Sequence, residues 1–193
     1  MNAPTTLTRC FPALALLGLA CGSGAGGSSL THYGDELSES VAAVRASLSE
    51  HHEAVLGETD LQQIRDLERQ HMDTMTMRIG RMQDAQDSMM RCSERMGTLG
   101  HMGALRSLDD AQGAMAQVMQ GATDAMQRHL DAMEAAADVD TALAEERHHQ
   151  SETDTLVDSM EHHDDELAHA MQTMQDDGMS MMCPMGSHMH RAF

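Results

Sequence analysis

The chain has 193 residues, of which 21 are Met and 13 are His, whereas aromatic residues make up 2% and the formal net charge is −19. Aromatic and β-branched residues favour strands, so this composition excludes a β-rich fold and predicts an all-α chain. The acidic balance excludes nucleic-acid binding, which requires Lys and Arg against the phosphates, and it favours the attraction of cations.

Residues 1–20 predict a secretory signal peptide, with one basic residue, no acidic residue and an apolar run too short to span a bilayer. The run ends in Leu-Gly-Leu-Ala-Cys21, which resembles a bacterial lipobox. It departs from the usual pattern because Gly18, not Leu, stands three residues before the cysteine. The resemblance implies lipidation of Cys21, a bacterial cell-envelope location facing the periplasm or the outside, and a flexible lipid-attached linker over 21–34. Ordinary signal cleavage and a free Cys21 thiol are the alternatives.

Apolar residues recur at helical spacing in four long stretches. We expect helices over about 35–56, 61–96, 104–136 and 139–177. Thr59 or Asp60 is expected to cap the second helix, and Asp138 or Asp140 the fourth. Because the connections are short, the fold class is an all-α, antiparallel up-down-up-down four-helix bundle over 35–177. The first helix is the shortest, so it should leave the Met-rich far half of the bundle uncovered.

Two of these helices carry a Glu-x-x-His pair on the face that should be buried. Glu68 and His71 interrupt the apolar positions of the second helix, and Glu146 and His149 do the same in the fourth, 78 residues later. The recurrence of caps and core positions at this offset predicts that the bundle is built from a duplicated helical hairpin.

The other two helices place imidazoles at the matching core positions, His51 and His129. All these side chains should lie in one or two adjacent layers near the same end of the bundle. Buried carboxylates are costly unless they are paired or bind a metal, so the pattern predicts a transition-metal site, with a hydrogen-bonded His–Glu network as the alternative. The predicted core ligands are His51, Glu68, His71, His129, Glu146 and His149.

The two Glu-x-x-His pairs resemble those of the di-metal carboxylate proteins of the ferritin-like class. The resemblance implies a metal site in a helical bundle and makes a di-metal oxidase an alternative function. The chain departs from that class because His51 and His129 stand where it uses Glu, and because the connection between the second and third helices is short. The nitrogen-rich set favours copper or zinc and keeps iron possible.

The C-terminal segment 178–193 is expected to be an irregular tail rich in Met, His and Cys. It resembles the Met/His-rich segments of bacterial envelope copper-handling proteins, which implies copper as the bound metal, because thioethers suit Cu(I). A low-complexity tail without ligand function is the alternative. The candidate ligands here are Met179, Met181, Met182, Cys183, Met185, His188, Met189 and His190.

Cys92 and Cys183 are the cysteines that remain once the signal and Cys21 are set aside. The ends of the second and fourth helices should meet, so an oxidising envelope predicts a Cys92–Cys183 disulfide. A Cys–Met–His copper site is the alternative.

Three adjacent histidine pairs occur in the chain, and neighbours on a helix point about 100° apart. Only one of each pair should therefore face the core. We expect His52, His148 and His162 at the surface.

These features predict a lipid-anchored envelope protein that binds and sequesters a transition metal, copper first. The sequence contains no phosphate-binding loop and no nucleophile motif, which favours a binding protein over an enzyme. A di-metal oxidase and a structural lipoprotein without metal are the alternatives. The expected partners are metal ions and, through the lipid alone, a membrane.

Overall fold

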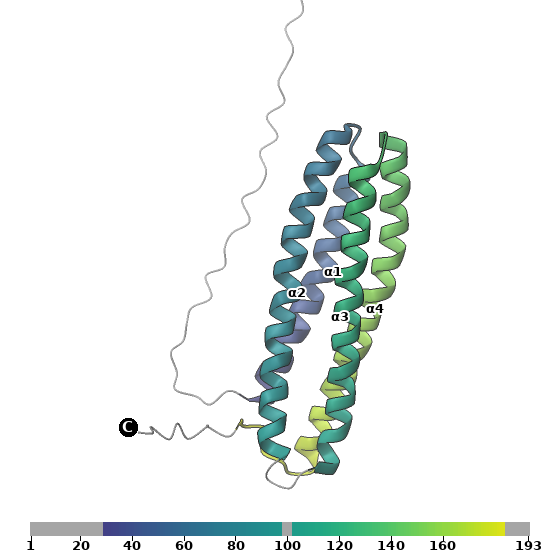
Figure 1. The fold of residues 1–193 in the computed structure, drawn as a ribbon. Coiled ribbons are helices and arrows are strands. Elements are labelled where there is room, and N and C mark those ends of the chain that lie inside the picture. The colour runs from purple at the N-terminus through teal and green to yellow at the C-terminus, as the bar shows by residue number, and fades with distance from the viewer. Residues whose placement is uncertain (1–28, 98–101, 184–193) are drawn as a thin grey trace, which may run out of the picture.

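The computed structural model describes residues 29–97 and 102–183, which form a bundle of four long helices (Figure 1). This confirms the predicted all-α bundle. None of these helices is both long and apolar enough to cross a bilayer. The helices are α1 (Leu30–Leu56), α2 (Leu61–Gly97), α3 (Met102–Ala135) and α4 (Val139–Asp176).

The helices pack in a ring: each lies against its neighbour in the sequence, and α1 also lies against α4. In Figure 1 the α1–α2 and α3–α4 turns lie together at one end, which we call the turn end. The end of α2, the start of α3 and the end of α4 lie at the opposite, far end. The internal duplication stays a prediction.

Side-chain caps define where three of the helices begin. Ser29 Oγ accepts a hydrogen bond from the His32 amide at 3.2 Å, at the start of α1. Asp60 and Asp138 do the same for α2 and α4, through the amides of Gln62 and Thr141, both at 2.8 Å. Such caps satisfy amides that have no partner within the helix.

The first helix begins earlier than the sequence predicted, at Leu30 instead of Asp35. Leu30 is fully buried, and its amide donates to the Met181 carbonyl at 2.9 Å. Ser29 also forms an isolated β-bridge with Met182, so the segment that follows α4 packs back beside the start of α1. The expectation of an uncovered Met-rich half was therefore wrong. Its methionines mostly lie in the core: Met82, Met89, Met96, Met115, Met119 and Met174 are buried.

The core is divided into two apolar clusters. The small cluster lies at the turn end, and the large cluster fills the rest of the bundle. The small cluster consists of Val55, Ile64, Met133, Ala136 and Ala142.

A disulfide joins Cys92 on α2 to Cys183, with an S–S distance of 2.02 Å and a sequence separation of 91. Cys92 is buried in the large cluster, and Cys183 packs against it. The disulfide therefore holds the segment after α4 against the far end of the bundle.

Two helix-interior glycines offer a test of the packing. A Cβ added at Gly80 or Gly113 would meet nothing within 4 Å. Because glycine weakens a helix interior relative to alanine, Gly80→Ala and Gly113→Ala should each raise the free energy of unfolding by about 0.5–1 kcal/mol. Urea unfolding measures this. Gly34→Ala is the contrast: its Cβ would crowd the Met171 side chain, so its gain should be smaller.

Candidate metal centre

All four helices contribute to one layer of polar side chains between the two apolar clusters. Its four main side chains each lie one helical turn farther into the bundle than a residue of the small cluster, because four positions separate the members of each pair. The pairs are His51 with Val55, Glu68 with Ile64, His129 with Met133, and Glu146 with Ala142. The layer is thus enclosed by apolar side chains on both sides. Its members, all buried, are His51, His52, Glu68, His71, His129, Glu146 and His149.

Four of these residues bring one ligand atom each to a common point. One donor atom from each of His51, Glu68, His129 and Glu146 lies within 4.8 Å of the other three. His129 Nε2 is 3.1 Å from Glu68 Oε2 and 3.1 Å from Glu146 Oε2. His51 Nε2 is 3.2 Å from Glu68 Oε1 and 3.7 Å from Glu146 Oε1. We call these four residues the convergent set.

Each carboxylate faces His51 with Oε1 and His129 with Oε2, and three of the four separations, 3.1, 3.1 and 3.2 Å, fall in the range of adjacent ligand atoms around one metal. A metal bound at about 2.1 Å holds adjacent ligand atoms about 3.0–3.4 Å apart and opposite ones about 4.2 Å apart. Two imidazole nitrogens and two carboxylate oxygens are also a common donor set for divalent transition metals. The convergent set could therefore hold a metal ion.

A hydrogen-bonded network accounts only in part for the same atoms. The described residues give only one well-formed hydrogen bond within the convergent set, between His129 Nε2 and Glu68 Oε2. His51 Nε2, Glu68 Oε1 and both carboxylate oxygens of Glu146 are buried and form no well-aligned hydrogen bond in the described structure, although imidazole nitrogens and carboxylate oxygens lie 3.1–3.7 Å apart there. Buried polar atoms normally have hydrogen-bond partners. These converging nitrogen and oxygen atoms therefore suit the binding of a cation better than a complete hydrogen-bonded network.

Two further imidazoles stack on the histidines of the convergent set. His71 lies parallel to His51, and His149 lies parallel to His129, each pair with ring centroids 3.8 Å apart. The i,i+3 spacing of each Glu-x-x-His pair puts the stacking ring one turn beyond the carboxylate. His71 and His149 thereby hold the two convergent imidazoles in place.

Burial and neighbouring charges divide the histidines of the layer into two kinds. Burial lowers the pKa of His71 to about 3 and of His149 to about 2, and it also lowers the pKa of His52. For His129 the opposing effect of burial is outweighed by the carboxylates of Glu146 and Glu68, which raise its pKa to about 9.

The carboxylate of Glu68 is held ionised. Burial alone would raise the pKa of Glu68, but the hydrogen bond from His129 and the adjacent His51 keep it well below its usual range. At neutral pH the metal-free layer therefore contains a carboxylate–imidazolium pair beside uncharged rings.

We expect the metal-free protein to be most stable near pH 6.5. Below that value the unfolded chain protonates His71 and His149 but the folded chain does not, so stability falls as the pH drops toward about 3. Above it the folded chain keeps the His129 proton that the unfolded chain has lost, so stability falls as the pH rises through about 9. Urea unfolding at pH 5, 6.5 and 9 should show a loss on the order of 2 kcal/mol at each extreme.

A control isolates the alkaline limb of this profile. His129→Asn should remove most of the decline between pH 6.5 and 9 while leaving the acid limb. An increase in stability of the metal-free protein over that interval would contradict the assignment of the retained proton to His129.

The surface position predicted for His52 was wrong, because His52 is 3% exposed. Its Nε2 lies 3.4 Å from Glu146 Oε1. The prediction assumed a narrow buried face, whereas α1 packs against both α2 and α4 and buries a stripe wide enough for two adjacent positions. The signal that could have predicted this burial is the place of His52 beside the core position of His51 in the heptad pattern. His148 and His162 are exposed, as predicted.

The predicted tail ligands lie far from this layer. Met179, Met181 and Cys183 are partly buried against the large cluster, and Met182 is exposed. They follow the end of α4, whereas His149 is near its start, so the two groups occupy opposite ends of the bundle. The remaining predicted sites lie outside the described residues: Cys21, Met185, His188, Met189 and His190.

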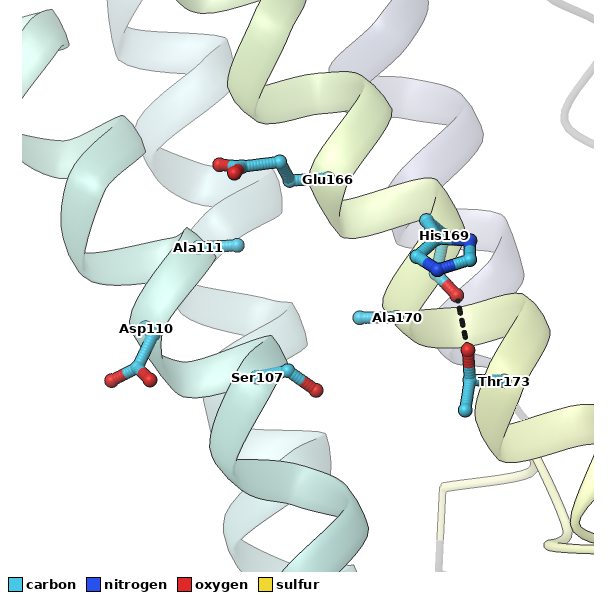
Figure 2. Close-up of a pocket in the computed structure, with 7 residues that line it drawn as sticks. All are labelled: Ser107, Asp110, Ala111, Glu166, His169, Ala170 and Thr173. Atoms are coloured by element: carbon cyan, nitrogen blue, oxygen red, sulfur yellow. Dashed lines mark hydrogen bonds between the residues drawn. The ribbon is translucent and has the colours of Figure 1, made fainter.

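Two other features of the described surface are less suited to a ligand. His162, His163 and Glu166 form a second group that could hold a cation, but it lies on one helix, is largely solvated, and already pairs His163 Nδ1 with Glu166 at 2.7 Å. A groove of about 430 Å³ runs between α3 and α4. Figure 2 shows Ala111 and Ala170 facing each other across it, and the hydrogen bond drawn there, from Thr173 Oγ1 to the His169 carbonyl, lies within α4.

Comparison of the chain with protein-family models, with curated proteins and with solved structures finds no match. The buried His/Glu layer is therefore the feature on which a functional assignment depends.

Proposed function

We propose that this protein binds one divalent transition-metal ion in its core, between His51, Glu68, His129 and Glu146, and that it serves to sequester the metal. The observation that carries the proposal is the convergence of four buried donor atoms within 4.8 Å, most of them without a hydrogen-bond partner. Of the predicted ligands, His71 and His149 are assigned the role of stacking supports for the two convergent imidazoles.

Charge and size both favour a single ion. Two carboxylates balance one divalent cation, which removes the cost of burying them. Opposite ligand atoms of one ion are about 4.2 Å apart, and the donor atoms of the convergent set, all within 4.8 Å of one another, are close to that span. A second divalent ion would leave an uncompensated positive charge in an apolar core. The di-metal oxidase is therefore the weaker candidate.

Copper is the metal that we expect to bind most tightly. Affinity at a mixed nitrogen and oxygen site rises across the first-row divalent metals to Cu²⁺ and falls at Zn²⁺. Met179 and Met181, which are partly buried near the far end, add thioethers that suit Cu(I). Zinc and iron are the competitors at the core site.

We also propose that the protein is an envelope lipoprotein attached through Cys21. The Cys92–Cys183 disulfide supports a location outside the reducing cytosol. Metabolic labelling with a radioactive fatty acid should mark the wild-type protein, and Cys21→Ala should abolish the label. A labelled Cys21→Ala protein would contradict the assignment.

Metal content tests the main proposal. Purified protein should be stripped with chelator, loaded separately with Cu²⁺, Zn²⁺ or Fe²⁺, freed of excess by gel filtration, and assayed by elemental analysis. We expect one equivalent of zinc per chain and at least one of copper, since the tail can add soft ligands for copper. Retention of none of the three metals would overturn the proposal and favour a structural lipoprotein.

A further inference from the structure

His52 is the one member of the polar layer whose position has no counterpart in the second half of the chain. The proposed duplication pairs His51 with His129, and the next residue is His52 in one copy and Leu130 in the other. A buried imidazole on one side of an otherwise matched layer makes the donor set asymmetric.

The His52 ring reaches one carboxylate of the convergent set, that of Glu146, although its nitrogen lies outside the group of four donor atoms that are all within 4.8 Å of one another. Its Nε2 is 3.4 Å from Glu146 Oε1, which is closer than the 3.7 Å between His51 Nε2 and that oxygen. The atom is buried and has no hydrogen-bond partner in the described structure. Leaving such a nitrogen unsatisfied in the core costs free energy unless a ligand engages it.

His71 and His149, the other two imidazoles of the layer outside the convergent set, differ from His52 in their contacts. Among the described residues, His71 and His149 make no contact with a carboxylate within 4 Å, and each is stacked on a convergent ring instead. His52 is not stacked on a convergent ring: its ring lies 5.8 Å from that of His51, with the planes tilted by 53°. The Nε2 atom of His52, and not the face of its ring, is therefore the part that contacts a charged group of the layer.

We propose that His52 is a fifth ligand of the core metal and that it makes the site selective for Cu²⁺ over Zn²⁺. This inference rests on the proposed function. Three nitrogens and two oxygens form a five-donor set, which suits the tetragonal geometries of Cu²⁺. Zn²⁺ in structural sites is almost always four-coordinate and tetrahedral, so it gains little from a fifth donor.

The test compares the full-length wild type with His52→Leu, which places in α1 the residue found at position 130. Competition with chelators of known strength measures the affinity for Cu²⁺ and Zn²⁺. We expect His52→Leu to weaken Cu²⁺ binding by about 10–100-fold and to change Zn²⁺ binding by less than about threefold. Pulsed electron paramagnetic resonance at one copper equivalent should count three imidazoles in the wild type and two in the variant.

Three controls keep the result interpretable. His148→Leu changes an exposed histidine and should alter neither affinity nor imidazole count. Glu68→Gln/Glu146→Gln reports the copper signal from elsewhere in the chain. His52→Gln, a polar replacement, repeats the measurement if circular dichroism shows that His52→Leu has lost helix.

The outcomes separate the two claims. A wild type that holds neither copper nor zinc in its core overturns the proposed function. Copper bound by two imidazoles in both wild type and variant overturns the role of His52 alone. Equal weakening of copper and zinc overturns the selectivity, because it would make His52 an ordinary ligand for both.

Discussion

The double variant Glu68→Gln/Glu146→Gln is expected to lose core metal binding, with affinity for Zn²⁺ reduced by at least about 100-fold. Both carboxylates lie between His51 Nε2 and His129 Nε2, at distances of 3.1–3.7 Å, and they supply the only anionic donors that contact those rings in the described structure. Glutamine keeps the size of each side chain but removes the charge that balances a divalent cation. Calorimetric titration with Zn²⁺ measures the loss.

A matched control replaces two solvent-exposed glutamates from the same end of the bundle, Glu53 and Glu134, by glutamine. It makes the same change in net charge and should leave zinc affinity within about threefold of the wild type. If the core and surface double variants lost affinity equally, general electrostatic attraction by the acidic chain would explain binding, and the core site would be wrong.

The same core variant should also alter the metal-free protein. The carboxylates of Glu146 and Glu68 raise the pKa of His129, so their removal should let that ring lose its proton at a lower pH. The decline in stability between pH 6.5 and 9 should then become shallower. This readout reports on the layer even in the absence of metal.

Breaking the Cys92–Cys183 disulfide should lower the free energy of unfolding by about 4–5 kcal/mol. The bond closes a loop across 91 residues of sequence, and a loop of that size removes much of the entropy of the unfolded chain. A decrease in melting temperature of about 10–15 °C should accompany it. Thermal unfolding of Cys92→Ser/Cys183→Ser, and of the wild type with and without reductant, measures the effect.

The variant without the disulfide should lose stability but keep its affinity for metal. Cys92 lies 24 residues after Glu68 on α2, or about 36 Å along the helix, so zinc binding at the core should change by less than about threefold. A reduced protein as stable as the oxidised one would show that the far end is held by other contacts. A large loss of zinc affinity would show that the two ends of the bundle are coupled.

Much of the fold could be predicted because local rules govern it. The spacing of apolar residues defines four helices. The caps of α2 and α4 were narrowed to Thr59 or Asp60 and to Asp138 or Asp140, because a capping side chain acts on amides two or three residues away. The early start of α1 was missed because it depends on Met181 and Met182, which are more than 150 residues away in sequence.

Helical periodicity places four side chains of the polar layer at core positions without any knowledge of the packing: Glu68, Glu146, His51 and His129. How these side chains are used follows from the packing of the four helices. Whether an imidazole donates to a carboxylate, stacks on another ring or faces solvent depends on the rotation and spacing of all four helices. That packing separates His71 and His149, which stack, from the four convergent donors, and it brings His52 into the core beside Glu146.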